Sequence, residues 1–260
     1  MSVSKLNDKG ATLIEDQRYD ITRGKVNGID YVRKFGKNPA PANGTPETVW
    51  DGSTAGDYPF LTAPTAITIS SSSDFDGNLP ANQGAQTVHI YGLLSGTWKP
   101  ASEIVAVSGT SVNAYERIYR AHIVTVGNSG VNVGNITMSG ADAVAYAQIL
   151  ANNGQTLMAC YTIPSGVTGY LDQWKCGVLA DNATTAKFGK FDLHTRSGTV
   201  SGTEGRRTRD SITLKDDLKI IDYAYPIKIT EMHDVWVNFT AGGNSTVATA
   251  GFNIRLENNS

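Results

Sequence analysis

Cysteine is scarce in this sequence, since Cys160 and Cys176 are the only two among 260 residues. Two cysteines are too few for the disulfide framework that stabilises many small secreted domains. Charged residues make up 18% of the chain, below the ~25% that is typical of soluble domains. The formal net charge is −2. Because a nucleic-acid-binding domain usually carries a basic surface, we expect no nucleic acid among the partners.

Long hydrophobic runs are also missing. No stretch of 18 apolar residues occurs, so we expect no membrane partner and no membrane-spanning helix. The first residues, MSVSKLNDKGATLIEDQ, are polar and lack the regions of a secretory signal. We therefore expect assembly in the cytoplasm of the cell that makes the protein.

What the sequence does contain is the pattern of β-strands. Apolar and polar residues alternate in several segments, separated by loops rich in Gly, Asn and Ser. The clearest of these strands are Thr65–Ser71, Ala85–Leu93, Ser102–Gly109 and Glu116–Gly127. The Ala-rich segment Ala141–Gly154 fits either a short helix or a strand, and its neighbours favour a strand. We predict an all-β fold, a jelly-roll-like antiparallel β-sandwich.

The first 45 residues differ from the rest. They are polar, contain the Pro-rich stretch FGKNPAPANG and show no sustained periodicity. Such a segment cannot bury enough apolar surface to fold alone. Tyr31, Val32 and Phe35 are unusual in a pure linker, however, and favour an arm that orders against a neighbouring subunit over a disordered tail. We predict an extended N-terminal arm at 1–45 and a β-sandwich domain at 46–260.

The stretch Gln155–Val178 contains both cysteines and a tryptophan. Its two strand-like arms flank the turn SGVTG, which predicts an antiparallel hairpin. Alternation places Leu157, Ala159 and Tyr161 on one face, and Met158, Cys160 and Thr162 on the other. We expect Trp174 to anchor the second arm by burial, and Cys160 to be a core thiol.

Residue patterns of catalysis and metal binding are weak. The histidines, His89, His122, His194 and His233, form no spaced pair. DFDGN (Asp74–Asn78) starts like a calcium loop, but position 12 is Ala85 where that loop requires Glu. We interpret it as a hairpin turn and expect no metal and no cofactor. The cluster Arg206, Arg207 and Arg209 is a candidate for binding phosphate or an acidic partner, although such a cluster flanked by Gly and Asp is most often a solvated loop. The four tryptophans and 11 tyrosines leave a sugar-binding surface open.

Several segments together resemble a family of virion structural proteins from tailed bacteriophages, notably those of marine and cyanobacterial hosts. The resemblance covers roughly residues 33–257 and is carried by FGKNPAPANGTPETVWDG, AITISSSSDFD, GAQTVHIYGLLSG, AHIVTVGNSGVNVGNITMSG, AQILANNGQTLMACYTIPSGVTGYL and AGFNIRLEN. It implies a component of the virion, on either the head or the tail. The family pattern supplies no functional residue to carry over.

The function predicted on this basis is structural and non-enzymatic. The protein would decorate or cement the capsid, binding the major capsid protein or other virion proteins through its N-terminal arm. Phage shell additives usually sit at symmetry axes, which favours a homotrimer. Tyr31, Val32, Phe35, Arg206, Arg207 and Arg209 are the candidate partner-binding residues. The alternatives are a tail or fibre component that binds host-surface glycan, and a glycan-processing enzyme with paired carboxylates.

Overall fold

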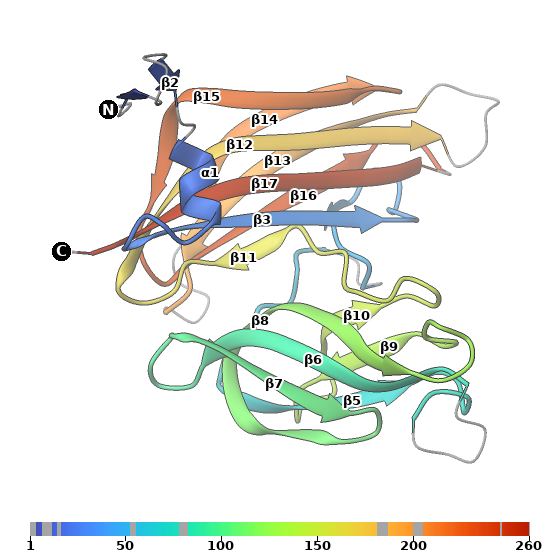
Figure 1. The fold of residues 1–260 in the computed structure, drawn as a ribbon. Helices are drawn as coiled ribbons and strands as arrows, with labels where there is room; N and C mark the ends of the chain where they lie inside the picture. The colour runs from blue at the N-terminus through green and yellow to red at the C-terminus, as the bar shows by residue number, and fades with distance from the viewer. Residues whose placement is uncertain are drawn as a thin grey trace.

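The computed structural model describes residues 4–6, 12–14, 17–52, 56–77, 83–180, 187–199, 205–244 and 246–259, most of them in antiparallel strands. The strands form two bodies, one above the other in Figure 1. The upper body, the sandwich, packs a four-stranded sheet against a five-stranded sheet. The lower body, the half-barrel, is one curled six-stranded sheet.

Strand order defines each sheet. The four-stranded sheet contains, in order, β15 (Leu218–Ile229), β12 (Val167–Ala180), β17 (Thr246–Asn258) and β3 (Ile29–Asn38). The five-stranded sheet contains β11 (Cys160–Thr162), β16 (His233–Ala241), β13 (Phe188–Ser197) and β14 (Arg207–Lys215), with β4 (Pro46–Thr48) also paired to β16. The half-barrel contains β10 (Ala145–Ile149), β9 (Ile136–Ser139), β5 (Thr65–Ser71), β8 (Thr110–Val126), β6 (Ala85–Leu94) and β7 (Pro100–Ala106).

Outside these sheets, β1 (Ser4–Leu6) pairs with β2 (Thr12–Ile14), and the short helix α1 (Gln17–Thr22) lies over the four-stranded sheet near the start of β3. Within the described residues, no helix is long and apolar enough to cross a membrane.

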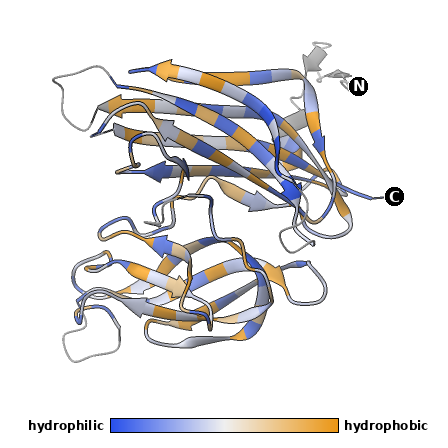
Figure 2. Cartoon of the chain, turned by 180° about the vertical axis from the view of Figure 1, so that it is seen from behind, coloured by the Kyte–Doolittle hydropathy of each residue, from blue (hydrophilic) through white to orange (hydrophobic). Residues whose placement is uncertain are grey.

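Each body has its own hydrophobic core, built by alternation along the strands. Apolar and polar residues follow one another along most strands in Figure 2. The half-barrel core includes Ile67 and Ile69 of β5. The sandwich core includes Trp174 and Phe239. Each such side chain is fully buried and stabilises the fold by roughly 1.5–3 kcal/mol. The predicted anchor Trp174 is confirmed, and its indole Nε1 donates to Asp210 over 3.1 Å.

One segment serves both cores. Ala159 and Tyr161 face the sandwich core, whereas Met158 and Cys160 face the half-barrel core. The predicted alternation of these residues is confirmed, and both of its faces are buried. Cys160 is a buried free thiol, and burial raises its pKa to about 12.

The predicted hairpin at Gln155–Val178 is wrong. β11 pairs with β16 in the five-stranded sheet, while β12 pairs with β15 and β17 in the four-stranded sheet. The turn between β11 and β12 therefore carries the chain from one layer of the sandwich to the other. Cys160 and Cys176 belong to different cores, and both are free.

The predicted arm and domain boundary also need correction. Part of the arm, β3, pairs along its length with β17, from Ile29 with Glu257 to Asn38 with Ala248. Apolar residues such as Val32, which is packed against the sandwich core, explain why it orders within its own chain. Residues 1–3, 7–11 and 15–16 of the predicted arm lie outside the described residues. The single sandwich predicted at 46–260 is a sandwich interrupted by the half-barrel between β4 and β11. The all-β antiparallel sandwich is confirmed, and jelly-roll connectivity stays a prediction.

Candidate functional site

The predicted partner-binding residues lie at opposite edges of the sandwich. Tyr31, Val32 and Phe35 lie on β3, at the edge that faces the half-barrel. Arg207 and Arg209 lie on β14, the edge strand of the other sheet, and Arg206 directly precedes it. The structure therefore does not bring the two groups together.

The arginine cluster is partly occupied within the chain. Arg206 forms an ion pair with Asp57 at 3.2 Å. Arg209 donates from Nε to the hydroxyl of Thr195 over 2.8 Å. Arg207 is exposed on β14. Two of the three arginines therefore bind residues next to β14, and the cluster does not form a single anion site.

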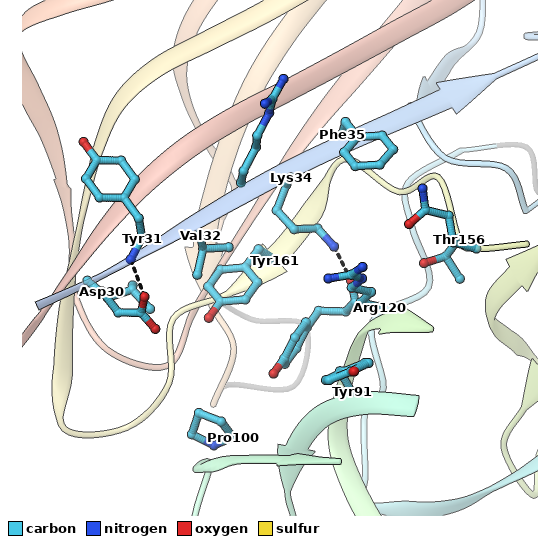
Figure 3. Close-up of a pocket in the computed structure, with 14 residues that line it drawn as sticks. Asp30, Tyr31, Val32, Lys34, Phe35, Tyr91, Pro100, Arg120, Thr156 and Tyr161 are labelled. Carbon is cyan, nitrogen blue, oxygen red and sulfur yellow. Dashed lines mark hydrogen bonds between the residues drawn. The ribbon is translucent and has the colours of Figure 1, made fainter. Parts of the chain in front are cut away.

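The residues of β3 line a cavity of about 440 Å³ between the sandwich and the half-barrel. We call it the tyrosine cavity, after Tyr91, Tyr119 and Tyr161 in its wall. Tyr119 of β8 and Tyr161 of β11 meet edge to face with ring centroids 5.1 Å apart, so each body supplies one ring of this pair. Figure 3 shows Lys34 and Tyr161 of the sandwich and Tyr91 and Arg120 of the half-barrel around this space, whereas the ring of Tyr31 points away from it.

Two cations face one another in this cavity. Lys34 is only 7% exposed, and its ammonium donates to the backbone carbonyl of Tyr119. Arg120 is exposed, and its guanidinium lies 5.7 Å from the ring centroid of Tyr91. The head groups of Lys34 and Arg120 are directed toward one another in Figure 3. Among the described residues neither forms an ion pair within 4 Å.

Burial shapes the charge of Lys34 and of the carboxyl group behind it. Burial lowers the pKa of Lys34 to about 8; the charge of Arg120 lowers it as well, while Cys160 and Asp51 act in the opposite direction. Burial also raises the pKa of Asp51 to about 8, against the hydrogen bond that its carboxyl accepts from the amide of Leu157. At neutral pH Asp51 is therefore mostly protonated and does little to balance Lys34.

The local sequence explains why Lys34 points inward. Val32, Lys34, Gly36 and Asn38 occupy alternate positions of β3, on the face turned into the protein. Gly36 lets three backbones meet there, because a Cβ on it would lie 2.2 Å from the carbonyl oxygen of Val49 and 2.3 Å from the amide nitrogen of Ala159. A lysine at an inward position was the sequence signal for this site, and it was missed.

Elsewhere along the junction of the two bodies, a buried cation has a carboxylate partner. Arg117 of β8 binds Asp234 of β16 through two hydrogen bonds, of 2.9 Å from Nε and 3.2 Å from Nη2. Asp234 is 0% exposed and also accepts from Thr162 over 2.7 Å and from Arg196 over 3.4 Å. We call this group the Asp234 site. It links the half-barrel to the sandwich.

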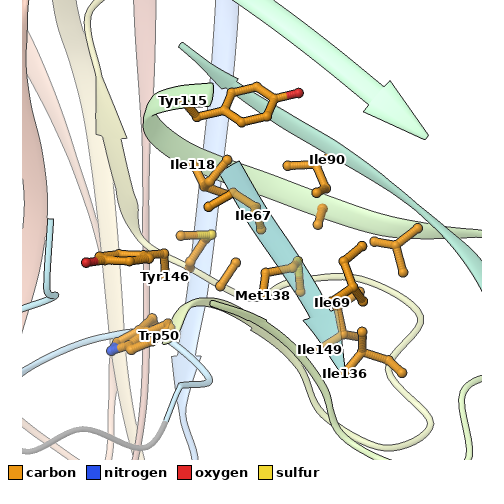
Figure 4. Close-up of a cluster of buried hydrophobic side chains, with 14 of the residues drawn as sticks. Trp50, Ile67, Ile69, Ile90, Tyr115, Ile118, Ile136, Met138, Tyr146 and Ile149 are labelled. Atoms are coloured by element: carbon orange, nitrogen blue, oxygen red, sulfur yellow. The ribbon is translucent and has the colours of Figure 1, made fainter. Parts of the chain in front are cut away.

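Aromatic side chains fill the space beside the Asp234 site. Trp50 contacts Tyr58, Tyr58 contacts Phe60 and Phe60 contacts Trp236, each pair edge to face with centroids 4.7–5.4 Å apart. Trp50 lies at the margin of the half-barrel core in Figure 4. Because all four rings are buried, the two bodies share apolar surface as well as an ion pair.

A second hollow lies on the solvent side of the four-stranded sheet. This outer groove, of about 610 Å³, has a wall that is largely apolar, with Phe35, Leu157, Leu218, Ile220 and Ala250. Phe35, Leu218 and Ile220 are 40%, 61% and 51% exposed. Arg33, Lys37 and Lys175 also line it. It is an apolar surface surrounded by positive charge.

The other candidate motifs have structural roles where they are described. Asp76, in the loop interpreted as a hairpin turn, accepts hydrogen bonds from Ser71 and from the amides of Ala85, Val133 and Gly134. No group of three or more metal-ligating His, Cys, Asp or Glu side chains occurs within the described residues. His89 and His122 flank Tyr91, and the hydroxyl of Tyr91 lies 3.0 Å from Nδ1 of His89.

Two carboxylates in or near strands, of the kind that a glycan-processing enzyme would pair, make separate local contacts. Glu103 accepts from the amides of Val112 and Asn113, whereas Glu231 accepts from the amide of Gly166.

No protein family matches the chain, and the comparison with curated proteins found no relative. Similar solved structures include a chain of the T13 viral particle of infectious bursal disease virus, at 11% identity and TM-score 0.18 over 93% of this chain and 78% of that one. The VP2 subviral particle of the same virus gives 10% identity and TM-score 0.18 over 89% and 76%. These are viral capsid chains, but likeness at such TM-scores does not establish a shared fold.

Proposed function

We propose that this chain is a bacteriophage virion structural protein without enzymatic activity, which decorates or cements the capsid. The sequence resemblance to virion proteins of tailed phages supports this function. Its partners would be the major capsid protein or other virion proteins, and its own copies in a homotrimer. The protein would be assembled in the host cytoplasm and reside in the virion.

The observation that carries the proposal is the outer groove. Exposed apolar patches on soluble proteins commonly mark interaction surfaces, and Phe35, Leu218 and Ile220 form such a patch. The cations Arg33, Lys37 and Lys175 favour a partner with carboxylates around an apolar centre. The occupant we propose is therefore an acidic segment of a capsid subunit with apolar side chains. The groove replaces the N-terminal arm as the proposed attachment element, although Phe35 belongs to both.

Cosedimentation of the purified protein with capsids that lack it tests this attachment. Ile220→Asp places a charge in the apolar wall of the groove and should weaken binding by about tenfold or more. Val112→Asp is the matched control, because Val112 is 91% exposed on the half-barrel. Equal binding of both variants would refute the groove as the attachment surface. Light scattering on the free protein tests the trimer.

A tail or fibre component that binds host glycan is the second candidate, and the tyrosine cavity is the observation in its favour. Immunogold labelling of intact phage with antibody against the recombinant protein separates the two. Gold over the head supports decoration or cement, whereas gold confined to the tail supports the second candidate. Gold on neither would refute both.

A further inference from the structure

We propose that the tyrosine cavity binds an acidic sugar, that is, a monosaccharide unit carrying a carboxylate. This inference deepens the second candidate function and rests on glycan binding, not on the outer groove. Its residues come from both bodies, with Lys34 and Tyr161 from the sandwich and Tyr91, Tyr119 and Arg120 from the half-barrel.

The charge of the cavity identifies the acidic part of the ligand. Two like charges that face one another without an ion-pair partner cost free energy, and an anion between them removes that cost. Lys34 and Arg120 are in this situation, because Arg120 acts on Lys34 through its charge and neither has a carboxylate within ion-pair distance among the described residues. Asp51 acts on the same ammonium, but its own burial keeps it mostly protonated at neutral pH.

The size of the tyrosine cavity and the rest of its wall identify the sugar part of the ligand. A cavity of about 440 Å³ lies within the range of roughly 300–1,000 Å³ that holds small ligands. Tyrosine rings offer flat apolar faces for the C–H side of a pyranose, and their hydroxyls offer hydrogen bonds. Gln155 on one side and Asp30 on the other add polar groups that can pair with sugar hydroxyls. A bare inorganic anion would use none of this wall.

The aromatic wall is already held in place. The ring of Tyr91 is stacked on His122 with centroids 5.6 Å apart and also contacts His89. Tyr161 is 4% exposed and packs against Tyr119. A site whose rings need no rearrangement loses little entropy on binding.

Calorimetric titration of the full chain with sodium glucuronate, methyl glucoside and inorganic phosphate tests the proposal. We expect glucuronate to bind more tightly than either of the others. Arg120→Ala should weaken glucuronate binding by about tenfold or more, with an unchanged melting temperature because Arg120 is exposed. Arg255→Ala is the matched control, since Arg255 also lies over a tyrosine ring, at 5.3 Å from Tyr170, but outside the cavity.

Three results would overturn the inference: no binding of glucuronate, equal binding of methyl glucoside, or tighter binding of phosphate. Loss of binding in Arg255→Ala as much as in Arg120→Ala would also overturn it. Ile220→Asp lies in the groove and should leave glucuronate binding unchanged. Capsid attachment and sugar binding can therefore fail independently of one another. Immunogold labelling of the head alone would refute a location on the tail but would leave the proposed sugar site untouched.

The pH dependence of glucuronate affinity gives an independent readout. Arg120, Asp51, Cys160 and the backbone carbonyl of Tyr119 surround the Lys34 ammonium. Because the pKa of Lys34 is about 8 in the free protein, the affinity should be flat below that pH and fall above it. A flat profile up to pH 10 would show that Lys34 takes no part.

Discussion

The junction of the sandwich and the half-barrel carries buried cations at two places, and only one of them supplies a matching carboxylate. At the Asp234 site, Asp234 accepts from Arg117, Arg196 and Thr162. In the tyrosine cavity, Lys34 and Arg120 have no such partner within the part of the chain that the structure describes, and burial keeps Asp51 mostly protonated at neutral pH. The first arrangement pairs its buried cation, Arg117, with a carboxylate within the fold, whereas the second leaves its buried cation, Lys34, without an ion pair among the described residues. The same junction thus combines a structural ion pair with the proposed sugar site.

The largest effect on stability is expected from a substitution at the Asp234 site. Asp234→Ala would leave Arg117 buried without its counter-charge, which should lower the free energy of unfolding by about 3–5 kcal/mol. Chemical denaturation measures this loss. The control Glu257→Ala removes the surface pair of Arg255 with Glu257 and should cost no more than ~1 kcal/mol. Similar losses in the two variants would mean that the buried pair contributes nothing special to the junction.

The next largest expected effect is a dependence of folding stability on pH that comes from Asp51. Its folded pKa of about 8 lies above the ordinary value of 3.8, so the folded state retains a proton that the unfolded state loses. This contribution to stability is complete below pH ~4 and decreases as pH rises toward 8, by at most about 1.4 kcal/mol per pH unit. Asp51→Asn should therefore gain stability relative to the natural protein as pH increases from 5 to 8, measured by thermal melts across that range.

Asp76 offers a control of opposite sign. Burial alone would raise the pKa of Asp76, but hydrogen bonds from Ser71 and from three backbone amides outweigh burial and lower it. Its contribution to stability is present above the unfolded pKa and is lost on acidification. Asp76→Asn should thus be least harmful at low pH. Parallel pH profiles for the Asp51 and Asp76 variants would contradict both assignments.

The smallest effect is expected for Lys34→Met. Removing an unpaired buried cation relieves a desolvation cost, while Met fills a similar volume and leaves the Tyr119 carbonyl without its donor. These terms oppose each other, so the free energy of unfolding should change by less than ~1 kcal/mol. Chemical denaturation measures this free energy, with Lys37→Met as the control variant. A loss as large as that of Asp234→Ala would show that Lys34 is structural.

Local features of the fold could be predicted because they depend on neighbouring residues. The strand at Thr65–Ser71 has the predicted bounds, and the ambiguous segment Ala141–Gly154 contains the strand β10. Alternation also placed Met158 and Cys160 opposite Ala159 and Tyr161. Alternation did not reveal that each of the two faces packs into a separate hydrophobic core. The reason is that apolar residues on both faces of a strand do not show whether they enter one core or two.

Long-range features could not be predicted in the same way. β3 pairs with β17 from the other end of the chain, and no local pattern specifies that pairing. The predicted hairpin failed because the turn at SGVTG crosses between layers instead of reversing within one sheet. Phe35 and Tyr31 were chosen for their aromatic character and do line the cavity. Lys34 and Arg120 meet only after two distant strands are brought together.

The path of the chain also determines the order in which the protein can fold during synthesis. The half-barrel strands are contiguous in sequence, from β5 to β10, so they can pair with each other before the rest of the chain has left the ribosome. The four-stranded sheet cannot close in this way, because β17 lies between β12 and β3 and follows both of them in the sequence. Until then β3 and β12 present unpaired edges, which are prone to join other chains. β17 therefore completes the sheet that β3 begins.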